Sequence, residues 1–151
     1  MERYDIGIIG TGPAGLSAAI NGKIRNKNII VFGNEDLSAK VTKAEKINNY
    51  LGFVNVSGNE LKNSFREHID SMDIKIVPER INNVYAMGDY FALMVNDVIY
   101  EVKTVILATG IEYTRPFPGE EHFIGRGVGY CATCDAPLYR GKTVAIIGYN
   151  K

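Results

Sequence analysis

The stretch from Tyr4 to Gly15, YDIGIIGTGPAG, decides the fold, because a short apolar run leads directly into a cluster of glycines. The run from Tyr4 to Ile9 is mostly β-branched and apolar, which predicts a buried strand. Pro13 predicts the first residue of a helix, since the N–H that proline lacks would have no partner there. A second apolar run, Ile29 to Phe32, predicts another buried strand. Together they predict a right-handed βαβ unit with parallel strands.

Gly10, Gly12 and Gly15 have the GxGxxG spacing of a dinucleotide-binding turn between a strand and a helix. The first glycine permits a tight turn, the second lets the backbone approach a pyrophosphate, and the third lets helix and strand pack closely. The helix that begins at Pro13 and Ala14 would present free N–H groups to the phosphates. The alternative interpretation is a glycine turn that binds nothing.

An acidic residue is expected near the end of the second strand, where its carboxylate would accept hydrogen bonds from the ribose hydroxyls. Glu35 is the candidate, since it lies 20 residues after Gly15. The match is imperfect, because Phe32, Gly33 and Asn34 stand between the strand and the acid.

The segments up to residue 110 predict one long helix and four more strands. Residues 34–56 have no clear period and predict a loop with a short helix. Ser57 to Glu60 is a capping box that predicts the start of an amphipathic helix. The end of the last strand, at Val105 to Ala108, is apolar and is expected to return to the buried sheet. The last three strands predict an antiparallel meander. The predicted strands are Ile74–Val77, Arg80–Ala86, Tyr90–Val95 and Val98–Ala108.

The composition of the sequence changes after Gly110. Residues 114–129 hold two prolines and four glycines and predict a connector between domains. Lys142 to Ile147 predicts a buried strand that meets Gly148, as at the start of a second dinucleotide-binding domain. We therefore expect the sequence to be the front part of a longer protein, with residues 130–151 beginning an incomplete second domain.

Cys131 and Cys134 form a CxxC pair with three interpretations. Zinc normally takes four ligands, and beyond this pair the chain offers only His68 and His122, neither at finger spacing, so a zinc site would need ligands outside this sequence. A structural disulfide closing so short a loop stabilises by about 2 kcal/mol, which is little reason for a cytoplasmic protein to retain it. A redox pair uses this spacing for rapid closure and a lowered thiol pKa. Asp135 is then a candidate proton donor, or else a helix N-cap.

Composition excludes several classes of function. Seventeen basic residues balance 17 acidic ones, which argues against nucleic acid or an anionic membrane as the main partner. No run of about 20 apolar residues exists, so no membrane span is predicted. Two cysteines are too few for a secreted disulfide framework. Asp5 and the glycine-rich run interrupt the apolar N-terminus, so we expect no signal peptide and a cytoplasmic location.

The order of these motifs resembles that of the low-molecular-weight thioredoxin reductases over the whole chain. A glycine turn near the start is followed by Ala108-Thr109-Gly110 after a meander, by the CxxC pair, and by a second Rossmann-type strand. Residues 125–135, GRGVGYCATCD, are very close to the redox segment of that family. Residues 47–52, INNYLG, look like its flavin-contacting loop, with Asn49 at the matching position.

This resemblance implies an α/β fold in which a Rossmann-like FAD-binding domain of three layers, a parallel sheet with an antiparallel β-meander, is interrupted by an inserted domain. Residues 1–113 would be the first FAD segment, 114–129 the connector, and 130–151 the start of the inserted redox-disulfide domain. The second FAD segment would lie outside this sequence, so the fragment alone should bind FAD poorly. No metal site is expected. The candidate FAD-binding residues are Gly10, Gly12, Pro13, Ala14, Gly15, Gly33, Glu35, Lys40, Asn49, Thr109 and Gly110.

Two departures from the family pattern matter. The Gly-Gly-Gln that precedes the flavin loop in the family appears here as Ser38-Ala39-Lys40, which makes Lys40 a candidate FAD contact. A glycine of the second dinucleotide turn is replaced by Asn150, whose side chain would intrude on a pyrophosphate and disfavours NADPH binding. In this second departure the sequence resembles the ferredoxin-dependent flavin thioredoxin reductases of clostridia.

The resemblance implies a flavin-dependent thioredoxin reductase, and a homodimer, as is usual in the family. Electrons would pass from FAD to the Cys131–Cys134 disulfide and then to oxidised thioredoxin, with Cys134 facing the flavin and Asp135 supplying protons. Reduced ferredoxin is the favoured electron donor and NADPH the second. Two alternatives stay open, an FAD-dependent dithiol oxidase of the same family and a non-catalytic FAD-binding module.

Overall fold

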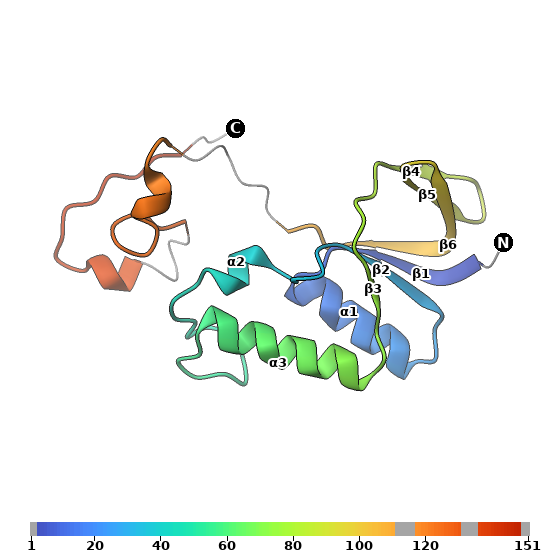
Figure 1. Cartoon of the computed structure of the whole chain (residues 1–151), viewed down its shortest axis with the longest axis horizontal. Helices are drawn as coiled ribbons and strands as arrows, with labels where there is room; N and C mark the ends of the chain where they lie inside the picture. Colours follow the sequence, from blue (N-terminus) through green and yellow to red (C-terminus); the bar gives the residue numbers. More distant parts are fainter. Residues whose placement is uncertain (1–2, 111–116, 131–135, 149–151) are drawn as a thin grey trace.

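The computed structural model of the protein describes residues 3–110, 117–130 and 136–148. Within these ranges six strands form one mixed sheet, with helices against one face (Figure 1). The strands are β1 (Arg3–Ile9), β2 (Ile29–Phe32), β3 (Ile76–Val77), β4 (Asn83–Ala86), β5 (Phe91–Val95) and β6 (Val98–Leu107). The helices are α1 (Pro13–Ile24), α2 (Ala39–Thr42), α3 (Gly58–Ser71) and the short 3₁₀ helices η1 (Glu120–His122) and η2 (Ala136–Tyr139).

The strand order β3-β2-β1-β6-β5-β4 combines a parallel part with an antiparallel part. Strands β3, β2, β1 and β6 are parallel, whereas β4, β5 and β6 form the predicted antiparallel meander. Strand β6 belongs to both parts, since its residues from Val98 to Val102 pair with β5 and those from Glu101 to Leu107 pair with β1. The predicted α/β fold with a parallel sheet and a β-meander is confirmed.

Alternate residues of β1 and β2 face two different cores, as the period of a strand requires. Ile8 and Val31 are buried against α1 and α3 in one cluster. Ile30 and Phe32 point to the other face, where they cluster with Leu93 of β5. Because β5 is not a sheet neighbour of β2, this contact means that the meander curls over the second face. The fold therefore has three layers, which are helices, parallel sheet and meander.

Helix α1 begins at Pro13 as predicted, and Leu16 and Ala19 are buried on its inner face. Ile24, five residues after the buried Ala19, is mostly exposed. The reason is its place in the last turn, because the helix ends at the C-cap Arg25 and the chain turns away toward β2.

Helix α3 begins with the predicted capping box. The Ser57 hydroxyl accepts from the Glu60 N–H at 3.2 Å, and the Glu60 carboxylate accepts from the Ser57 N–H at 2.9 Å. A further bond from the Ser57 hydroxyl to this carboxylate helps to hold the pKa of Glu60 below its ordinary value of 4.5.

We expect Ser57→Ala to lower the free energy of unfolding by about 1 kcal/mol, because it removes a helix cap. A carboxyl group with a lowered folded-state pKa contributes stability that is present above its unfolded pKa and lost as the pH falls through the folded value. The difference between wild type and variant should therefore be full above pH 4.5 and shrink below it. Urea unfolding at several pH values measures this, and a difference that does not change with pH would contradict the role given to Glu60.

The strand predictions were wrong in three places. Residues 142–147 do not form the predicted buried strand, and Ile146 is 92% exposed. A strand is stable only beside another strand, and none of the described segments pairs with this one. Strand β4 begins at Asn83, so residues 80–82 lie outside it. The end of β6 does return to the sheet, but Ile106 and Leu107 are exposed rather than buried.

Part of the predicted connector, residues 117–129, has local structure. Its 3₁₀ helix η1 contains Glu120, which is buried and accepts from the Phe117 N–H at 2.6 Å. Ile124 and Val128 form an isolated bridge that closes the following turn. Residues 114–116 lie outside the described residues. The segment is thus a folded turn over its described part, and the domain boundaries stay predictions.

Candidate functional site

The predicted glycine turn lies where the carboxyl ends of three strands meet. The Gly10 N–H donates to the Phe32 carbonyl at 2.8 Å, and the Ala108 N–H donates to the Ile9 carbonyl at 2.8 Å. These bonds bring the ends of β1, β2 and β6 side by side. Open parallel sheets bind ligands at this edge, because the loops and helix N-termini that follow the strands gather there.

Two of the three glycines are explained by the packing of the protein itself. A Cβ atom on Gly15 would lie 1.9 Å from the Gly10 carbonyl oxygen, so α1 can approach β1 only without a side chain. A Cβ atom on Gly10 would lie 2.2 Å from the Ala108 carbonyl oxygen, and the φ of Gly10 is +120°. Gly10 and Gly15 are therefore required by the fold whether or not the turn binds a ligand.

Gly12 is different, because nothing in the described protein requires a glycine at this position. Its φ of −77° and ψ of 177° suit any residue, and a Cβ atom there would meet no atom within 4 Å. Gly12 is the N-cap of α1, and the first turn of that helix has no acidic residue. A helix N-terminus with uncapped N–H groups and a partial positive charge binds phosphate well. The space in front of Gly12 thus fits a pyrophosphate that approaches the backbone.

A cleft of about 480 Å³ opens at the same edge of the sheet. Gly10, Gly33 and Thr109 line it from the ends of β1, β2 and β6. Residues 78–81, which follow the parallel strand β3, form a fourth wall that was not predicted from the sequence. The carboxyl ends of parallel strands meet at one edge of a sheet, so the residues after β3 could have been predicted to line the cleft. They were not, because residues 80–82 were assigned to a strand.

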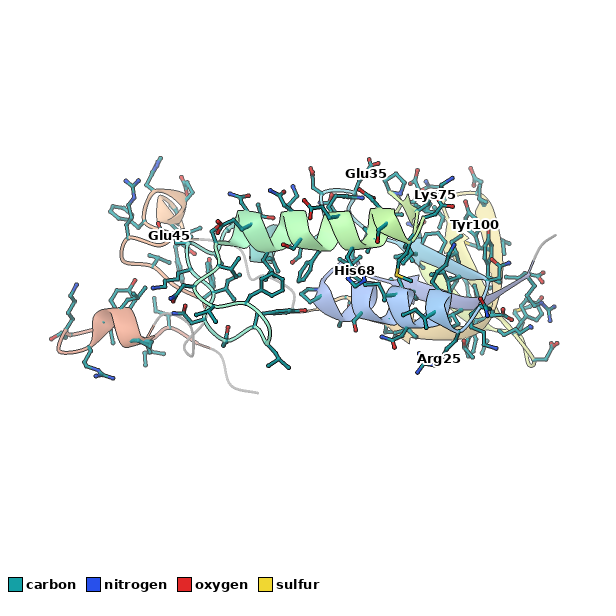
Figure 2. All side chains as sticks on the ribbon, turned by 90° about the horizontal axis from the view of Figure 1, so that it is seen from below. Arg25, Glu35, Glu45, His68, Lys75 and Tyr100 are labelled. Atoms are coloured by element: carbon teal, nitrogen blue, oxygen red, sulfur yellow. The ribbon has the colours of Figure 1, made fainter. Side chains whose placement is uncertain are left out.

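Glu35 lies in the turn after β2, directly after Asn34, which lines the cleft. Its side chain is exposed at the surface beside α3 (Figure 2). Its carbonyl oxygen accepts a hydrogen bond from Arg66 of α3. The backbone around the candidate ribose acid is therefore held in place while its carboxylate faces solvent.

The loop that contains Asn49 is closed and anchored, although Asn49 itself is exposed. Ile47 and Val56 exchange two backbone hydrogen bonds of 2.7 and 3.2 Å that close the loop. The Tyr50 ring packs on Phe65 of α3, with 5.5 Å between ring centroids. The loop is thus fixed at its base, and Asn49 is presented outward.

The remaining predicted site residues differ in how far the structure describes them. Pro13 and Ala14 form the first turn of α1, and the exposed Gly110 follows the end of β6 with a φ of +72°. Lys40 belongs to α2, and its side chain lies outside the described part of the structure. The residues that lie wholly outside the described ranges are Cys131, Cys134, Asp135 and Asn150.

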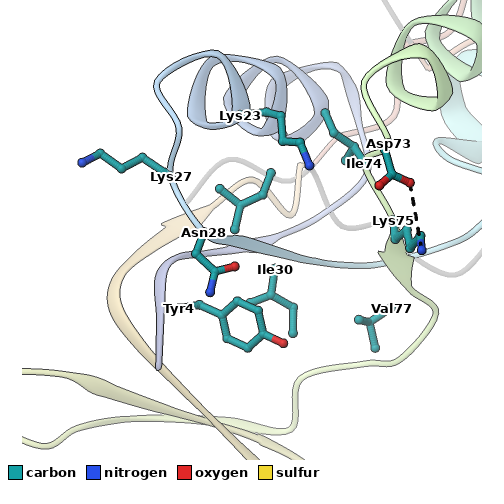
Figure 3. A pocket seen from close by; sticks show the side chains of 10 residues that line it. Tyr4, Lys23, Lys27, Asn28, Ile30, Asp73, Ile74, Lys75 and Val77 are labelled. Carbon is teal, nitrogen blue, oxygen red and sulfur yellow. Dashed lines mark ion pairs between the residues drawn. The ribbon is translucent and has the colours of Figure 1, made fainter. Parts of the chain in front are cut away.

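A second cleft, of about 280 Å³, lies at the opposite edge of the sheet (Figure 3). Lys23, Lys27 and Lys75 line it, and Lys75 is 4.0 Å from Asp73. This cleft adjoins the C-terminal end of α1, whose partial negative charge repels phosphate. The first edge is therefore the better candidate for a dinucleotide site, despite the three lysines here.

No helix in the described ranges is long and apolar enough to cross a membrane. No group of three His, Cys, Asp or Glu side chains in the same ranges is placed to hold a metal ion.

Comparison with known proteins places this geometry in a family. Residues 4–148 match the family described as pyridine nucleotide-disulphide oxidoreductase. The chain belongs to this family. Its glycine turn, meander and CxxC pair all lie within the matched residues.

Relatives within the family include a thioredoxin reductase of Mycoplasma genitalium, which is 36% identical over 96% of this chain and 47% of its own length. A 34.2 kDa protein from a rubredoxin operon of Clostridium pasteurianum is 36% identical over 97% of this chain and 48% of its own length. The chain therefore spans about half the length of the curated relatives it matches.

Solved structures of the family agree with the fold. A ferredoxin-flavin thioredoxin reductase from Clostridium acetobutylicum is 61% identical, has a TM-score of 0.74, and is matched over 99% of this chain and 52% of its own. A thioredoxin reductase from Streptococcus pyogenes is 34% identical with a TM-score of 0.83, over 91% of this chain and 45% of its own. These matches extend the Rossmann-like assignment to the whole described sheet.

Proposed function

We propose that this chain is the first part of a flavin-dependent thioredoxin reductase that takes its electrons from reduced ferredoxin. The similarity to the ferredoxin-flavin thioredoxin reductase of Clostridium acetobutylicum carries this proposal, because it extends over almost the whole chain. Thioredoxin is then the partner that receives the electrons, and ferredoxin the partner that supplies them.

FAD is the cofactor of the thioredoxin reductases in this family, and the residues present fit it. The open space at Gly12 and the uncapped N-terminus of α1 suit its pyrophosphate. Glu35 would accept hydrogen bonds from the ribose hydroxyls, and Asn49 and Lys40 would contact the flavin end. When bound, FAD would supply the redox chemistry that takes electrons from the donor and passes them to the cysteine pair.

The Cys131–Cys134 pair would carry electrons to the partner by thiol–disulfide exchange. Two electrons and two protons would reduce the pair to two thiols, with Asp135 passing on the protons one at a time and being reprotonated from solvent. One thiolate then attacks the thioredoxin disulfide and forms a mixed disulfide, and the second thiol releases reduced thioredoxin. The pair ends as a disulfide again, so electrons and protons balance over one turnover.

A sequence feature also supports ferredoxin as the electron donor, in addition to the similarity to the Clostridium acetobutylicum enzyme. Asn150 stands where the second dinucleotide turn of the family has a glycine. Its side chain would occupy the space that a pyrophosphate of NADPH needs. A protein without that site requires another reductant.

We further propose that another segment of the protein completes the FAD domain. Thr104 to Leu107 of β6 pair with β1 on one side, and within the described residues no strand pairs with their other side. The exposed Ile106 and Leu107 lie on the same stretch. A free strand edge with apolar neighbours supports a missing strand there. The homodimer and the cytoplasmic location stay predictions.

The electron donor is tested by mixing the anaerobic whole protein, loaded with FAD, with either reduced ferredoxin or NADPH. Ferredoxin should bleach the flavin absorbance within the turnover time and reduce thioredoxin, whereas NADPH should do neither. Rapid bleaching by NADPH would end the ferredoxin proposal. Oxygen uptake with a dithiol but without thioredoxin would instead mark a dithiol oxidase.

A further inference from the structure

Thr11 stands between the two glycines of the turn, and its side chain faces the protein interior. It is only 5% exposed, unlike the open position at Gly12 beside it. Its hydroxyl donates a hydrogen bond of 2.9 Å to the carbonyl oxygen of Asn34, 23 residues away. Thr11 therefore links the glycine turn after β1 to the turn after β2.

The two turns also pack closely at this point. A Cβ atom on Gly33 would lie 2.8 Å from both the hydroxyl oxygen and the methyl carbon of Thr11. Gly33 thus leaves room for the threonine side chain, which fills the space between the turns. The link consists of packing as well as a hydrogen bond.

The turn that receives this hydrogen bond is internally rigid. The Asn34 carbonyl also accepts from the Leu37 N–H at 3.0 Å, and the Asn34 side chain accepts from the Asp36 N–H at 2.8 Å. Leu37 has a φ of +62° and is almost fully buried, which anchors the end of the turn in the core. Arg66 holds the carbonyl oxygen of Glu35 from α3. Glu35 consequently keeps a fixed place relative to Asn34.

We propose that Thr11 is a positioning residue for the adenine-dinucleotide cofactor, an inference that rests on the proposed function. The pyrophosphate at Gly12 and the ribose at Glu35 belong to one ADP group, so their separation is fixed by covalent bonds. The Thr11 hydroxyl fixes the separation of the two turns that receive them. A site whose spacing is preset loses less conformational freedom on binding. Being buried, the hydroxyl acts through these turns rather than by touching the cofactor.

The test compares Thr11→Val, which keeps the shape and removes the hydroxyl, with Thr11→Ser, which keeps the hydroxyl. Thr104→Val is the matched control, because the Thr104 hydroxyl makes the same kind of bond, 2.9 Å to the Asp5 carbonyl, away from the glycine turn. The whole protein is freed of flavin, and its affinities for FAD, ADP and FMN are measured by calorimetry. Thermal unfolding of each apoprotein is measured in parallel.

Thr11→Val should bind FAD and ADP about three- to tenfold more weakly, the value of one hydrogen bond, with FMN binding unchanged. Thr11→Ser should retain most of the wild-type affinity, and Thr104→Val all of it. Equal FAD affinity in wild type and Thr11→Val would overturn the inference, as would an equal loss for FMN. A wild-type protein that binds neither FAD nor ADP would instead overturn the proposed function itself.

Discussion

Replacing either Cys131 or Cys134 by serine is expected to abolish thioredoxin reduction while leaving the flavin in place. A hydroxyl cannot take part in thiol–disulfide exchange, so either change stops the transfer of electrons from the flavin to the partner. The expected rate is that of the reaction without enzyme. It is measured with the whole protein, reduced ferredoxin and thioredoxin, by following the appearance of thioredoxin thiols.

The flavin provides the internal control for these two variants. Its absorbance should show wild-type occupancy, and reduced ferredoxin should still bleach it, because the cysteines are not expected to hold the cofactor. Full turnover in either serine variant would refute the proposed redox pair. Loss of the flavin would show that the cysteines act in binding instead.

Gly12→Ser is expected to weaken FAD binding by at least about tenfold without destabilising the protein, a change of about 1.4 kcal/mol in binding free energy. The backbone of Gly12 suits any residue, and apart from its two chain neighbours no atom of the described residues lies within 4 Å of the added Cβ. Serine is also a favourable N-cap, so the apoprotein should be as stable as wild type or more stable. The new side chain would occupy the space proposed for the pyrophosphate and compete for the same N–H groups. Calorimetry with FAD and thermal unfolding of the apoprotein measure the two effects.

Gly15→Ala is the matched control, because it should lower the stability of the apoprotein, which Gly12→Ser should leave intact. Alanine favours a helix over glycine by about 1 kcal/mol. Its Cβ would nevertheless lie 1.9 Å from the Gly10 carbonyl oxygen, and relieving such a contact costs about 3 kcal/mol. This variant should unfold at a lower temperature even without FAD. If Gly12→Ser bound FAD as tightly as wild type, the glycine turn would not be the pyrophosphate site.

The parts of the fold that were predicted correctly depend on local rules. The βαβ unit could be read from Tyr4 to Phe32, because strand and helix periods and the position of Pro13 are properties of neighbouring residues. The capping box at Ser57 was found for the same reason. The meander followed from short turns between alternating runs.

The parts that were predicted incorrectly depend on partners that are distant in the chain. Residues 142–147 have the composition of a buried strand, but an apolar run becomes a strand only beside another strand. Residues 80–82 could be read as the start of a strand, whereas they line or flank the cleft after β3. In both cases the composition alone could not tell which neighbour the segment meets.

The amino-acid order alone was enough to establish the α/β class, the glycine turn and the CxxC pair, since each depends on short spacings. Only the folded chain distinguished Gly12 from Gly10 and Gly15, and only the folded chain brought the Thr11 hydroxyl to Asn34. Those contacts join residues from different strand ends, and their distances depend on how the sheet and its loops pack in three dimensions.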